Sequence, residues 1–279
     1  SSSPGIALMQ EGITYMAGAE VPGVFVNVQR GGPGLGTIQP SQGDYFQACK
    51  GGGHGDYRNL VIAPASVQEL YELTVEAFNL ADKYRMTCMI LGDGTLGQMM
   101  EPVAFRDVEP IVEPEKPWAA CGRGGRAEHN TVTSIYIQPD DLERKNLELV
   151  EKYKIIERDE VRYEAIGLED AEIVIVAFST CSRICRNVIR QAAEKGIKVG
   201  MIKIRVFRPF PGEELAEALR KVKAVAILDR AESFSGEGGP VGSELKAALM
   251  DAGVSTIAVN YFYGIGGRDY TVSDAEAVY

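Results

Sequence analysis

The sequence predicts an α/β protein built from two doubly wound domains, each with a parallel sheet covered by helices. Three observations lead to this prediction. Strand-like and helix-like segments alternate over 1–104, the alternation returns over 166–279, and the hydrophobic periodicity weakens over 105–165. Alternating strands and helices are typical of parallel sheets with helices on both faces. We therefore predict a first domain over 1–104, a linker region over 105–165 and a second domain over 166–279.

The first region carries the elements of an incomplete domain. Helices are predicted over 6–19, from apolar residues at helical spacing, and over the capped amphipathic segment 66–85. The predicted strands are "GVFVNVQ" at 23–29, "NLVIAPA" at 59–65 and "MTCMILGDG" at 86–94. The chain begins with "SSSPG", which is typical of a loop that leads into a helix, and no strand precedes it. We therefore expect the first part of this domain to be missing from the sequence.

The second region alternates more regularly than the first. Its predicted strands are 171–179, 197–207, 223–231 and 255–262, and its predicted helices are 182–195, 211–222 and 239–253. The linker region is rich first in Pro and acidic residues, then in Gly, and ends in the charged helical segment 140–166. In doubly wound domains the ligands lie at the carboxyl ends of the strands, so we expect binding residues there.

The composition excludes several classes of partner. The net charge of −10 and the pI near 4.9 are the reverse of the basic surface that nucleic acids require. The same acidity argues against an acidic ferredoxin docking on this chain, so we expect electrons to leave through another subunit. We find no apolar run of membrane-spanning length and no basic start of a signal peptide, and we therefore expect a cytoplasmic protein without a membrane contact.

The cysteines and histidines favour neither disulfides nor metal binding. The five cysteines are odd in number and contain no CxxC pair, which is typical of free thiols in a reducing compartment, and we expect them to be small buried side chains. No HExxH motif or cysteine cluster has the spacing of a metal or iron–sulfur site. We therefore predict no metal held by this chain alone.

Arg30 directly follows the predicted strand 23–29 and precedes the loop "GGPGLG". A guanidinium at the carboxyl end of a parallel strand lies where such sheets bind ligands, and its planar fork matches a carboxylate in two hydrogen bonds. Gly31 and Gly32 would let a substrate or another subunit's backbone approach closely. An ordinary salt bridge at a strand end is the alternative. A nucleotide-phosphate loop is disfavoured, because no helix starts after these glycines and no GKS or GKT follows.

Other loops offer weaker candidates. "KGGGHGDYR" contains Lys50 and His54, and His54 is one of only two histidines, so acid–base work would fall to it; a flexible surface loop is the alternative. "FSTCSR" places Ser179 and Thr180 at a helix start, where they suit capping or an anion. The loops "ESFSGEGGPVGSE" and "YGIGGRD" lie at strand ends, and subunit contact there is as plausible as a ligand.

Several motifs occur together along the chain. They are "SSSPG" at 1–5, "VQRGGPGLG" at 28–36, "KGGGHGDYR" at 50–58, "LGDGTLGQMMEPV" at 91–103, "RPFP" at 208–211 and "GIGGRD" at 264–269. Over essentially the whole chain this set resembles the alpha subunit of the 2-oxoacid:ferredoxin oxidoreductases. The "GGPGLG" and "KGGGHGDYR" forms are more similar to the 3-methyl-2-oxobutanoate (2-oxoisovalerate) branch than to the 2-oxoglutarate branch.

The resemblance implies a thiamine diphosphate enzyme that oxidatively decarboxylates a branched-chain 2-oxoacid to acyl-CoA and reduces ferredoxin. It implies a pyrimidine-binding-like first domain and a transketolase C-terminal-like second domain. The expected partners are a beta subunit that shares the thiamine diphosphate and holds Mg²⁺, an iron–sulfur subunit with a [4Fe-4S] cluster, ferredoxin, and CoA as co-substrate. We expect the assembly to be a dimer of heteromers.

The resemblance also implies roles for particular residues. Arg30 matches the position that binds the substrate's carboxylate or carbonyl group, and Ser3, Pro4 and Gly5 match a loop that packs near the aminopyrimidine. The family's glutamate that bonds the pyrimidine nitrogen lies upstream of "SSSPG", and neither Glu11 nor Glu20 occupies that motif. Without this glutamate, activation of the cofactor would be severely impaired.

Three alternatives stay open on the sequence alone. The substrate is 2-oxoglutarate or pyruvate in the first alternative. In the second, the chain is a non-catalytic assembly or scaffold piece that shapes a partner's site. A binder similar to electron-transfer flavoproteins, which also have two α/β domains, is the third, and the "QRGGPGLG" segment gives it little support.

Overall fold

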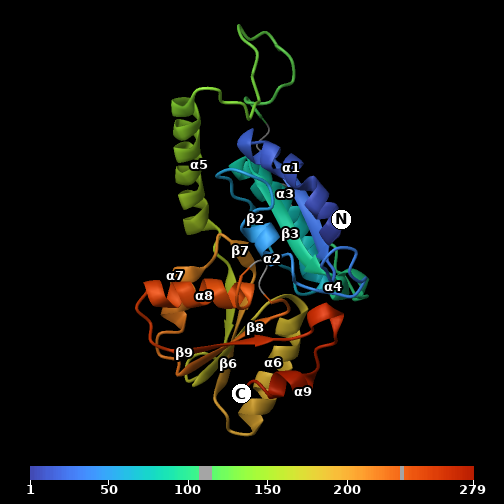
Figure 1. The fold of residues 1–279 in the computed structure, drawn as a ribbon, viewed down its shortest axis with the longest axis vertical. Helices are drawn as coiled ribbons and strands as arrows, with labels where there is room; N and C mark the ends of the chain where they lie inside the picture. The colour runs from blue at the N-terminus through green and yellow to red at the C-terminus, as the bar shows by residue number, and fades with distance from the viewer. Residues whose placement is uncertain (107–114, 233–235) are drawn as a thin grey trace.

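The computed structural model describes residues 1–106, 115–232 and 236–279. Two sheets lie one beyond the other along the long axis of the molecule, and a long helix, α5 (Pro139–Asp159), stands beside the upper one (Figure 1). The N-terminus lies in the upper part and the C-terminus in the lower part. The predicted α/β class with two largely parallel sheets is confirmed.

The first sheet has the strand order β1-β3-β2-β7. Its strands are β1 (Gly23–Gln29), β2 (Leu60–Ile62), β3 (Thr87–Asp93) and β7 (Val206–Arg208). The first three strands are parallel, and β7 pairs antiparallel with β2. Four helices belong to this part of the chain: α1 (Ser3–Gly18), α2 (Tyr45–Cys49), α3 (Val67–Tyr84) and α4 (Gly94–Gln98).

Alternation along β3 explains how helices come to cover both faces of this sheet. Every residue of β3 is buried, as expected for a central parallel strand. Cys88 and Ile90 pack into a cluster with α3, whereas Met89 and Leu91 pack into the cluster that contains residues of α1 and α2. Successive side chains of a strand point to opposite faces, so one apolar strand supports both layers.

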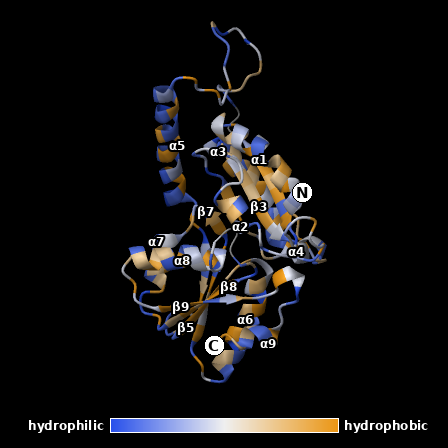
Figure 2. Ribbon diagram, in the orientation of Figure 1, coloured by the Kyte–Doolittle hydropathy of each residue, from blue (hydrophilic) through white to orange (hydrophobic). Residues whose placement is uncertain are grey.

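The second sheet has the order β4-β6-β5-β8-β9. Its strands are β4 (Tyr163–Ile166), β5 (Ile173–Ala177), β6 (Val199–Ile204), β8 (Ala224–Asp229) and β9 (Ile257–Phe262). Only β4 runs antiparallel to its neighbour. The helices of this part are α6 (Ser179–Glu194), α7 (Gly212–Ala218), α8 (Pro240–Asp251) and α9 (Val272–Glu276), with a 3₁₀ turn η1 (Ile265–Gly267). In Figure 2 the strands of both sheets are predominantly hydrophobic, whereas α5 mixes hydrophobic and hydrophilic residues.

Two helix starts differ in how they are capped. Ser66 caps α3 as predicted, because its hydroxyl accepts the N–H of Glu69 at 3.1 Å. Of the two roles left open for Ser179, capping of α6 is contradicted, and the predicted helix start at 182 is wrong. Ser179 is the first helical residue, with a positive φ of 51°, and its buried hydroxyl has no partner among the described residues. A capping hydroxyl belongs one position earlier, where Phe178 stands.

The strand predicted over 197–207 is in fact two strands. The chain breaks at Arg205, and Val206 and Phe207 leave the second sheet to join the edge of the first one as β7. Both side chains are buried in clusters that include first-domain residues. A sequence run of apolar residues does not reveal which of two sheets each part of it will enter.

An aromatic cluster joins the two sheets. Phe207 stacks edge-on against Tyr45 of α2 at 4.9 Å and against Phe178 at 4.7 Å between ring centroids. At the rim, the guanidinium of Arg208 is bonded to the carboxylate of Glu244 in α8, and the hydroxyl of Tyr45 donates to the same carboxylate at 2.6 Å. Burial by itself would raise the pKa of the Glu244 carboxyl, but Arg208 holds that pKa below its ordinary value.

The predicted linker region contains ordered structure in the part that is described. The charged segment forms α5, and β4 straddles the boundary predicted at 165. Residues 107–114, within the Pro-rich and acidic stretch, lie outside the described residues, as do residues 233–235 of the loop "ESFSGEGG". α5 is fastened to the end of α1, because Glu20 is paired with both Lys145 and Lys152.

Four of the five cysteines are buried and all five are free thiols, so the sequence prediction is wrong only in the burial of Cys121, which is exposed. Cys121 lies in the Gly-rich segment 119–125, away from both sheets.

Within the described residues, no helix combines the length and the apolar character needed to cross a lipid bilayer.

The ion pairs of Glu20 should make stability depend on pH. Burial alone would raise the pKa of Glu20, but hydrogen bonds from Lys145 and Lys152 lower it from 4.5 to about 2. Because the folded-state pKa is depressed, this stabilisation is complete above pH 4.5 and is lost as the pH falls toward 2. We expect Glu20→Gln to lower the free energy of unfolding at pH 7 by about 1–2 kcal/mol, after allowing for partial solvent screening.

The measurement is urea denaturation of both proteins at pH 7 and at about pH 3.5. Glu11→Gln is the control, because Glu11 is an exposed glutamate of α1, the helix that ends just before Glu20. The difference in the free energy of unfolding between the wild type and Glu20→Gln should be smaller at the lower pH. The same difference at both pH values would contradict the assignment of this stabilisation to the ion pairs of Glu20.

Candidate active site

Arg30 lies where the sequence places it, directly after β1 at the carboxyl end of the first sheet. Its backbone forms an isolated bridge with Pro40, which closes the loop 31–39 at its base. One terminal nitrogen of the guanidinium, Nη1, donates to the carbonyl oxygens of Leu35 at 2.8 Å and Thr37 at 3.3 Å. The side chain is therefore anchored to its own loop by one nitrogen.

The other edge of the Arg30 guanidinium is unoccupied by the described residues. Neither Nε nor Nη2 makes a hydrogen bond or an ion pair within 1–106, 115–232 or 236–279. These two nitrogens form the side-on fork that binds a carboxylate through two parallel hydrogen bonds. The half-buried position and the fixed Nη1 leave this fork held in place with its donors free.

Ser3, in the first turn of α1, meets the backbone of Arg30. Its hydroxyl accepts the N–H of Arg30 at 3.1 Å and lies 3.3 Å from the carbonyl oxygen of the same residue. Pro4 occupies the first turn of the helix, and a Cβ on Gly5 would lie 2.1 Å from the hydroxyl oxygen of Ser1. The structure thus brings "SSSPG" and Arg30, which are far apart in the sequence, into one site.

The glycine loop after Arg30 is tightly folded on one side and open on the other. Gly36 has a φ of 57°, and a Cβ there would lie only 1.8 Å from the carbonyl oxygen of Gly31. By contrast, a Cβ on Gly32 would meet nothing within 4 Å. The open side is adjacent to Arg30 in sequence and is the side from which another molecule can approach the backbone.

Lys50 and His54 lie away from Arg30. Lys50 pairs with Glu244 of the second domain at 2.9 Å, so its charge is engaged in the domain contact. The loop of His54 packs on the later part of α1, where the hydroxyl of Thr14 donates to the His54 carbonyl oxygen at 2.8 Å, and the His54 side chain is exposed. Ser3 and Thr14 are separated by about 16 Å along a helix. The structure does not bring Lys50 or His54 together with Arg30.

Behind the loop lies a buried polar network that the sequence analysis did not identify. Asp93, at the carboxyl end of β3, is fully buried and accepts from Gln42 Nε2 and from the Thr180 hydroxyl, both at 3.4 Å. Arg230, at the end of β8, has Nη1 3.9 Å from an Asp93 carboxylate oxygen. Asp93 and Arg230 are each the next-to-last residue of a predicted strand, 86–94 and 223–231, which was the available signal. Only the fold shows that the two strand ends face each other.

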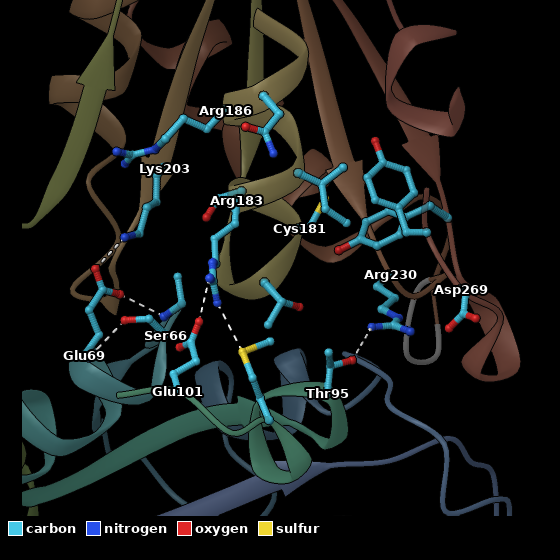
Figure 3. A pocket seen from close by; sticks show the side chains of 18 of the residues that line it. Ser66, Glu69, Thr95, Glu101, Cys181, Arg183, Arg186, Lys203, Arg230 and Asp269 are labelled. Carbon is cyan, nitrogen blue, oxygen red and sulfur yellow. Dashed lines mark hydrogen bonds and ion pairs between the residues drawn. The ribbon is translucent and has the colours of Figure 1, made fainter. Parts of the chain in front are cut away.

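A cleft of about 780 Å³ opens on the other side of this network, between α6 and the first domain (Figure 3). Its cations are already paired with carboxylates. Arg183 contacts Glu101 at 2.6 Å, and Lys203 contacts Glu69 at 2.6 Å. Burial would raise the pKa of Glu69, but its hydrogen bond with Lys203 lowers it. Both pairs bridge the two domains, so the cleft is lined by contacts that fasten them together.

The residues around Arg30 fit only part of what a thiamine-type cofactor and a 2-oxoacid require. Donors for a carboxylate are present, but a glutamate beside the site and a set of metal ligands are lacking among the described residues. The free guanidinium fork has the charge and geometry to bind a carboxylate, and the open backbone at Gly32 leaves room for another group beside it. Glu20 is engaged with Lys145 and Lys152, and Glu11 lies about 12 Å along α1 from Ser3, so neither is a carboxylate of this site. Among the described residues no three His, Cys, Asp or Glu side chains are grouped as metal ligands.

Two family models match the chain. The model described as pyruvate flavodoxin/ferredoxin oxidoreductase, thiamine diphosphate-binding, matches residues 1–164, and that described as pyruvate:ferredoxin oxidoreductase core domain II matches residues 171–275. The first covers the part that holds Arg30 and Ser3. The second covers most of the second sheet.

Curated relatives agree with these models. The chain is 51% identical over 217 residues to the ketoisovalerate oxidoreductase subunit VorB of Methanothermobacter thermautotrophicus, covering 78% of this chain and 61% of the relative. It is 34% identical over 251 residues to the 2-oxoglutarate synthase subunit KorA of Methanocaldococcus jannaschii, covering 82% and 67%. This chain thus spans about three fifths of the length of the VorB relative.

A solved structure has the same fold. It is a 2-oxoglutarate:ferredoxin oxidoreductase from Magnetococcus marinus, determined with 2-oxoglutarate, coenzyme A and succinyl-CoA bound. The TM-score is 0.75 at 23% sequence identity, and the match covers 99% of this chain and 51% of that one.

The contrast between Gly36 and Gly34 gives a test of the loop geometry. Both have positive φ, 57° and 64°, so alanine costs each about 1–2 kcal/mol of backbone energy. Only at Gly36 would the new Cβ collide with the loop, since a Cβ on Gly34 meets nothing within 4 Å. We expect the Thr37 amide, which donates to the Gly31 carbonyl oxygen at 2.9 Å, to exchange with solvent about 10-fold faster in Gly36→Ala than in Gly34→Ala. Equal exchange rates in the two variants would contradict this geometry.

Proposed function

Because this chain belongs to the 2-oxoacid:ferredoxin oxidoreductase family, we propose that it is the alpha subunit of a thiamine diphosphate-dependent enzyme of the ketoisovalerate type. The reaction takes a branched-chain 2-oxoacid, CoA and two oxidised ferredoxins. It gives acyl-CoA, CO₂, a proton and two ferredoxins that have each gained one electron. The identity to VorB, which exceeds that to KorA, supports a branched-chain substrate over 2-oxoglutarate.

The observation that carries this proposal is the half-engaged guanidinium of Arg30. Its Nη1 is fixed by two carbonyl oxygens of the loop, while Nε and Nη2 are free. In the proposed reaction these two nitrogens bind the carboxylate of the 2-oxoacid and orient its keto carbon. A charge-assisted bidentate contact of this kind fixes both position and orientation of a substrate.

The cofactor, when bound, supplies a nucleophilic carbon and an electron sink for decarboxylation. Ser3 holds the Arg30 backbone through two contacts of its hydroxyl, and with Pro4 and Gly5 it forms the wall that we assign to the aminopyrimidine side. We assign the diphosphate and its Mg²⁺ to a beta subunit.

Exposed apolar side chains around the site support a partner polypeptide there. Leu8 on α1 is 88% exposed, and Leu35 and Ile38 of the Arg30 loop are 86% and 75% exposed. Exposed apolar side chains on the segments that carry a candidate site are typical of an interface. We propose that the beta subunit covers them and excludes water from the substrate, and that an iron–sulfur subunit passes the electrons to ferredoxin. Five free thiols suit a reducing cytoplasm for this assembly, which we expect to be a dimer of heteromers.

The test is reconstitution with candidate beta and iron–sulfur subunits, thiamine diphosphate, Mg²⁺ and CoA, followed by reduction of a viologen dye. We expect kcat/KM to be highest for 2-oxoisovalerate, compared with 2-oxoglutarate and pyruvate. A complex that assembles but reduces no dye with any 2-oxoacid, and that stays inactive when the upstream segment with the family's glutamate is added to the chain, would favour the scaffold alternative.

Substitution of Arg30 tests the assigned role. Arg30→Ala should lower kcat/KM by ~10²-fold or more, because it removes a charge-assisted bidentate contact. Arg30→Lys should be nearly as poor, since one ammonium cannot replace the fork. Arg190→Ala, an exposed arginine on α6, is the matched control and should leave kcat/KM unchanged. Wild-type kinetics in Arg30→Ala would overturn the assignment.

A further inference from the structure

Gln42 lies on the segment that returns from the Arg30 loop to α2, and its side chain is tied to the second domain. It is only 2% exposed. Its Nε2 donates to Asp93 Oδ2 at 3.4 Å, and its Oε1 accepts from the Tyr263 hydroxyl at 3.2 Å. We propose that Gln42 is a positioning residue that holds the Arg30 loop in its substrate-binding conformation by tying it to Asp93 and to the second domain.

The chemistry of the two partners explains why an amide stands here. The carboxylate of Asp93 can only accept, so it needs a donor from position 42, and the phenol of Tyr263 donates, so it needs an acceptor. A glutamine side chain is neutral and presents both at once. The two partners therefore also fix which end of the amide faces which domain.

Asp93 makes this link common to both domains. It accepts the backbone N–H of Leu96 in the first domain at 3.0 Å and the Thr180 hydroxyl of the second at 3.4 Å. Arg230, which is 5% exposed, lies 3.9 Å away from the same carboxylate. Through Gln42 the loop is therefore attached to Asp93, the residue at the end of β3 that the second domain also contacts.

A second contact supports the same loop from the same domain. The turn η1, close to Tyr263 in sequence, packs against the loop, because a Cβ on Gly267 would lie 2.2 Å from Gln39 Cβ. A Cβ added to Gly31 would lie 3.8 Å from the carbonyl carbon of Gly266, which belongs to η1. The segment that anchors Arg30 Nη1 therefore rests on the second domain at Gly31, Gln39 and Gln42.

Removing one of the two hydrogen bonds of the Gln42 side chain should make the Arg30 loop less ordered while Arg30 itself is kept. Tyr263→Phe leaves Gln42 Oε1 buried without its donor, which is more costly than removing both partners. We expect amide exchange over 31–42 to become at least ~5-fold faster in the purified chain. In the reconstituted complex we expect kcat/KM to fall ~10-fold, the scale of one buried hydrogen bond.

The matched control is Tyr270→Phe. Tyr270 stacks on Tyr263 with ring centroids 4.3 Å apart, but its hydroxyl has no hydrogen-bond partner among the described residues. In Tyr270→Phe, the amide exchange rates over 31–42 and kcat/KM should match those of the wild type. If Tyr270→Phe and Tyr263→Phe have the same effect, the loss reflects general packing and the proposal is overturned.

Gln42→Glu adds a second test, the pH dependence of kcat/KM, which would not change if residue 42 only filled space. A protonated glutamic acid can donate to Asp93 and accept from Tyr263, whereas the carboxylate would repel Asp93 and donate nothing. The other titratable groups facing this point are Arg230 at the end of β8 and Cys181 of α6, beside Tyr263. We expect the ratio of variant to wild-type kcat/KM to rise at least ~5-fold as the pH falls from about 8 to about 6. A ratio that does not change with pH in a variant with wild-type circular dichroism would overturn the proposal.

The proposal rests on the proposed function, and the two fail in different ways. If the wild-type complex shows no turnover with any 2-oxoacid, the proposed function fails, while the exchange experiment still decides whether Gln42 orders the loop. Unchanged exchange over 31–42 in folded Tyr263→Phe overturns the positioning role whatever the activity. If Gln42→Glu fails to fold, the comparison of Tyr263→Phe with Tyr270→Phe decides.

Discussion

A buried ion pair between Arg208 and Glu244 joins the two halves of the molecule. Arg208 ends β7, which is hydrogen-bonded to the first sheet, and Glu244 lies on α8, which covers the second. Both side chains are largely buried, and Tyr45 donates to the same carboxylate. Removing one member of such a pair leaves a charge buried without compensation, which typically costs about 3–5 kcal/mol. The relative position of the two sheets depends on this contact and on the aromatic cluster next to it.

That relative position also shapes the candidate active site. Arg30 and Ser3 belong to the first domain, but the loop that anchors Arg30 leans on η1 and is tied through Gln42 to Tyr263. The polar network around Asp93 draws side chains from both domains. The second domain contributes no group to the guanidinium fork of Arg30, but through these contacts it can still determine how rigidly the fork is held.

The same geometry fits the proposed division of labour with partner subunits. This chain offers a fixed guanidinium with two free donors and an open glycine backbone, but neither Glu11 of α1 nor Glu20, which follows α1, contributes a carboxylate to the site. Exposed leucine and isoleucine side chains lie on α1 and on the Arg30 loop. In this arrangement one chain would bind the carboxylate and another would complete the cofactor site. The site would then stay incomplete and open to water until the assembly forms.

The sequence by itself determined the α/β class, most strands and helices, the Ser66 cap and the placement of Arg30 at a strand end, because periodicity, capping and glycine content are local properties. Its motifs also indicated the family. Only the tertiary structure decided that β7 leaves the second sheet for the first, that Ser179 does not cap α6, and that Lys50 serves the domain contact instead of joining Arg30. It also brought Ser3 to Arg30 and Gln42 to Tyr263. These outcomes depend on which strand ends and loops meet across two packed domains, and no local pattern of residues encodes a distance between segments so far apart in the chain.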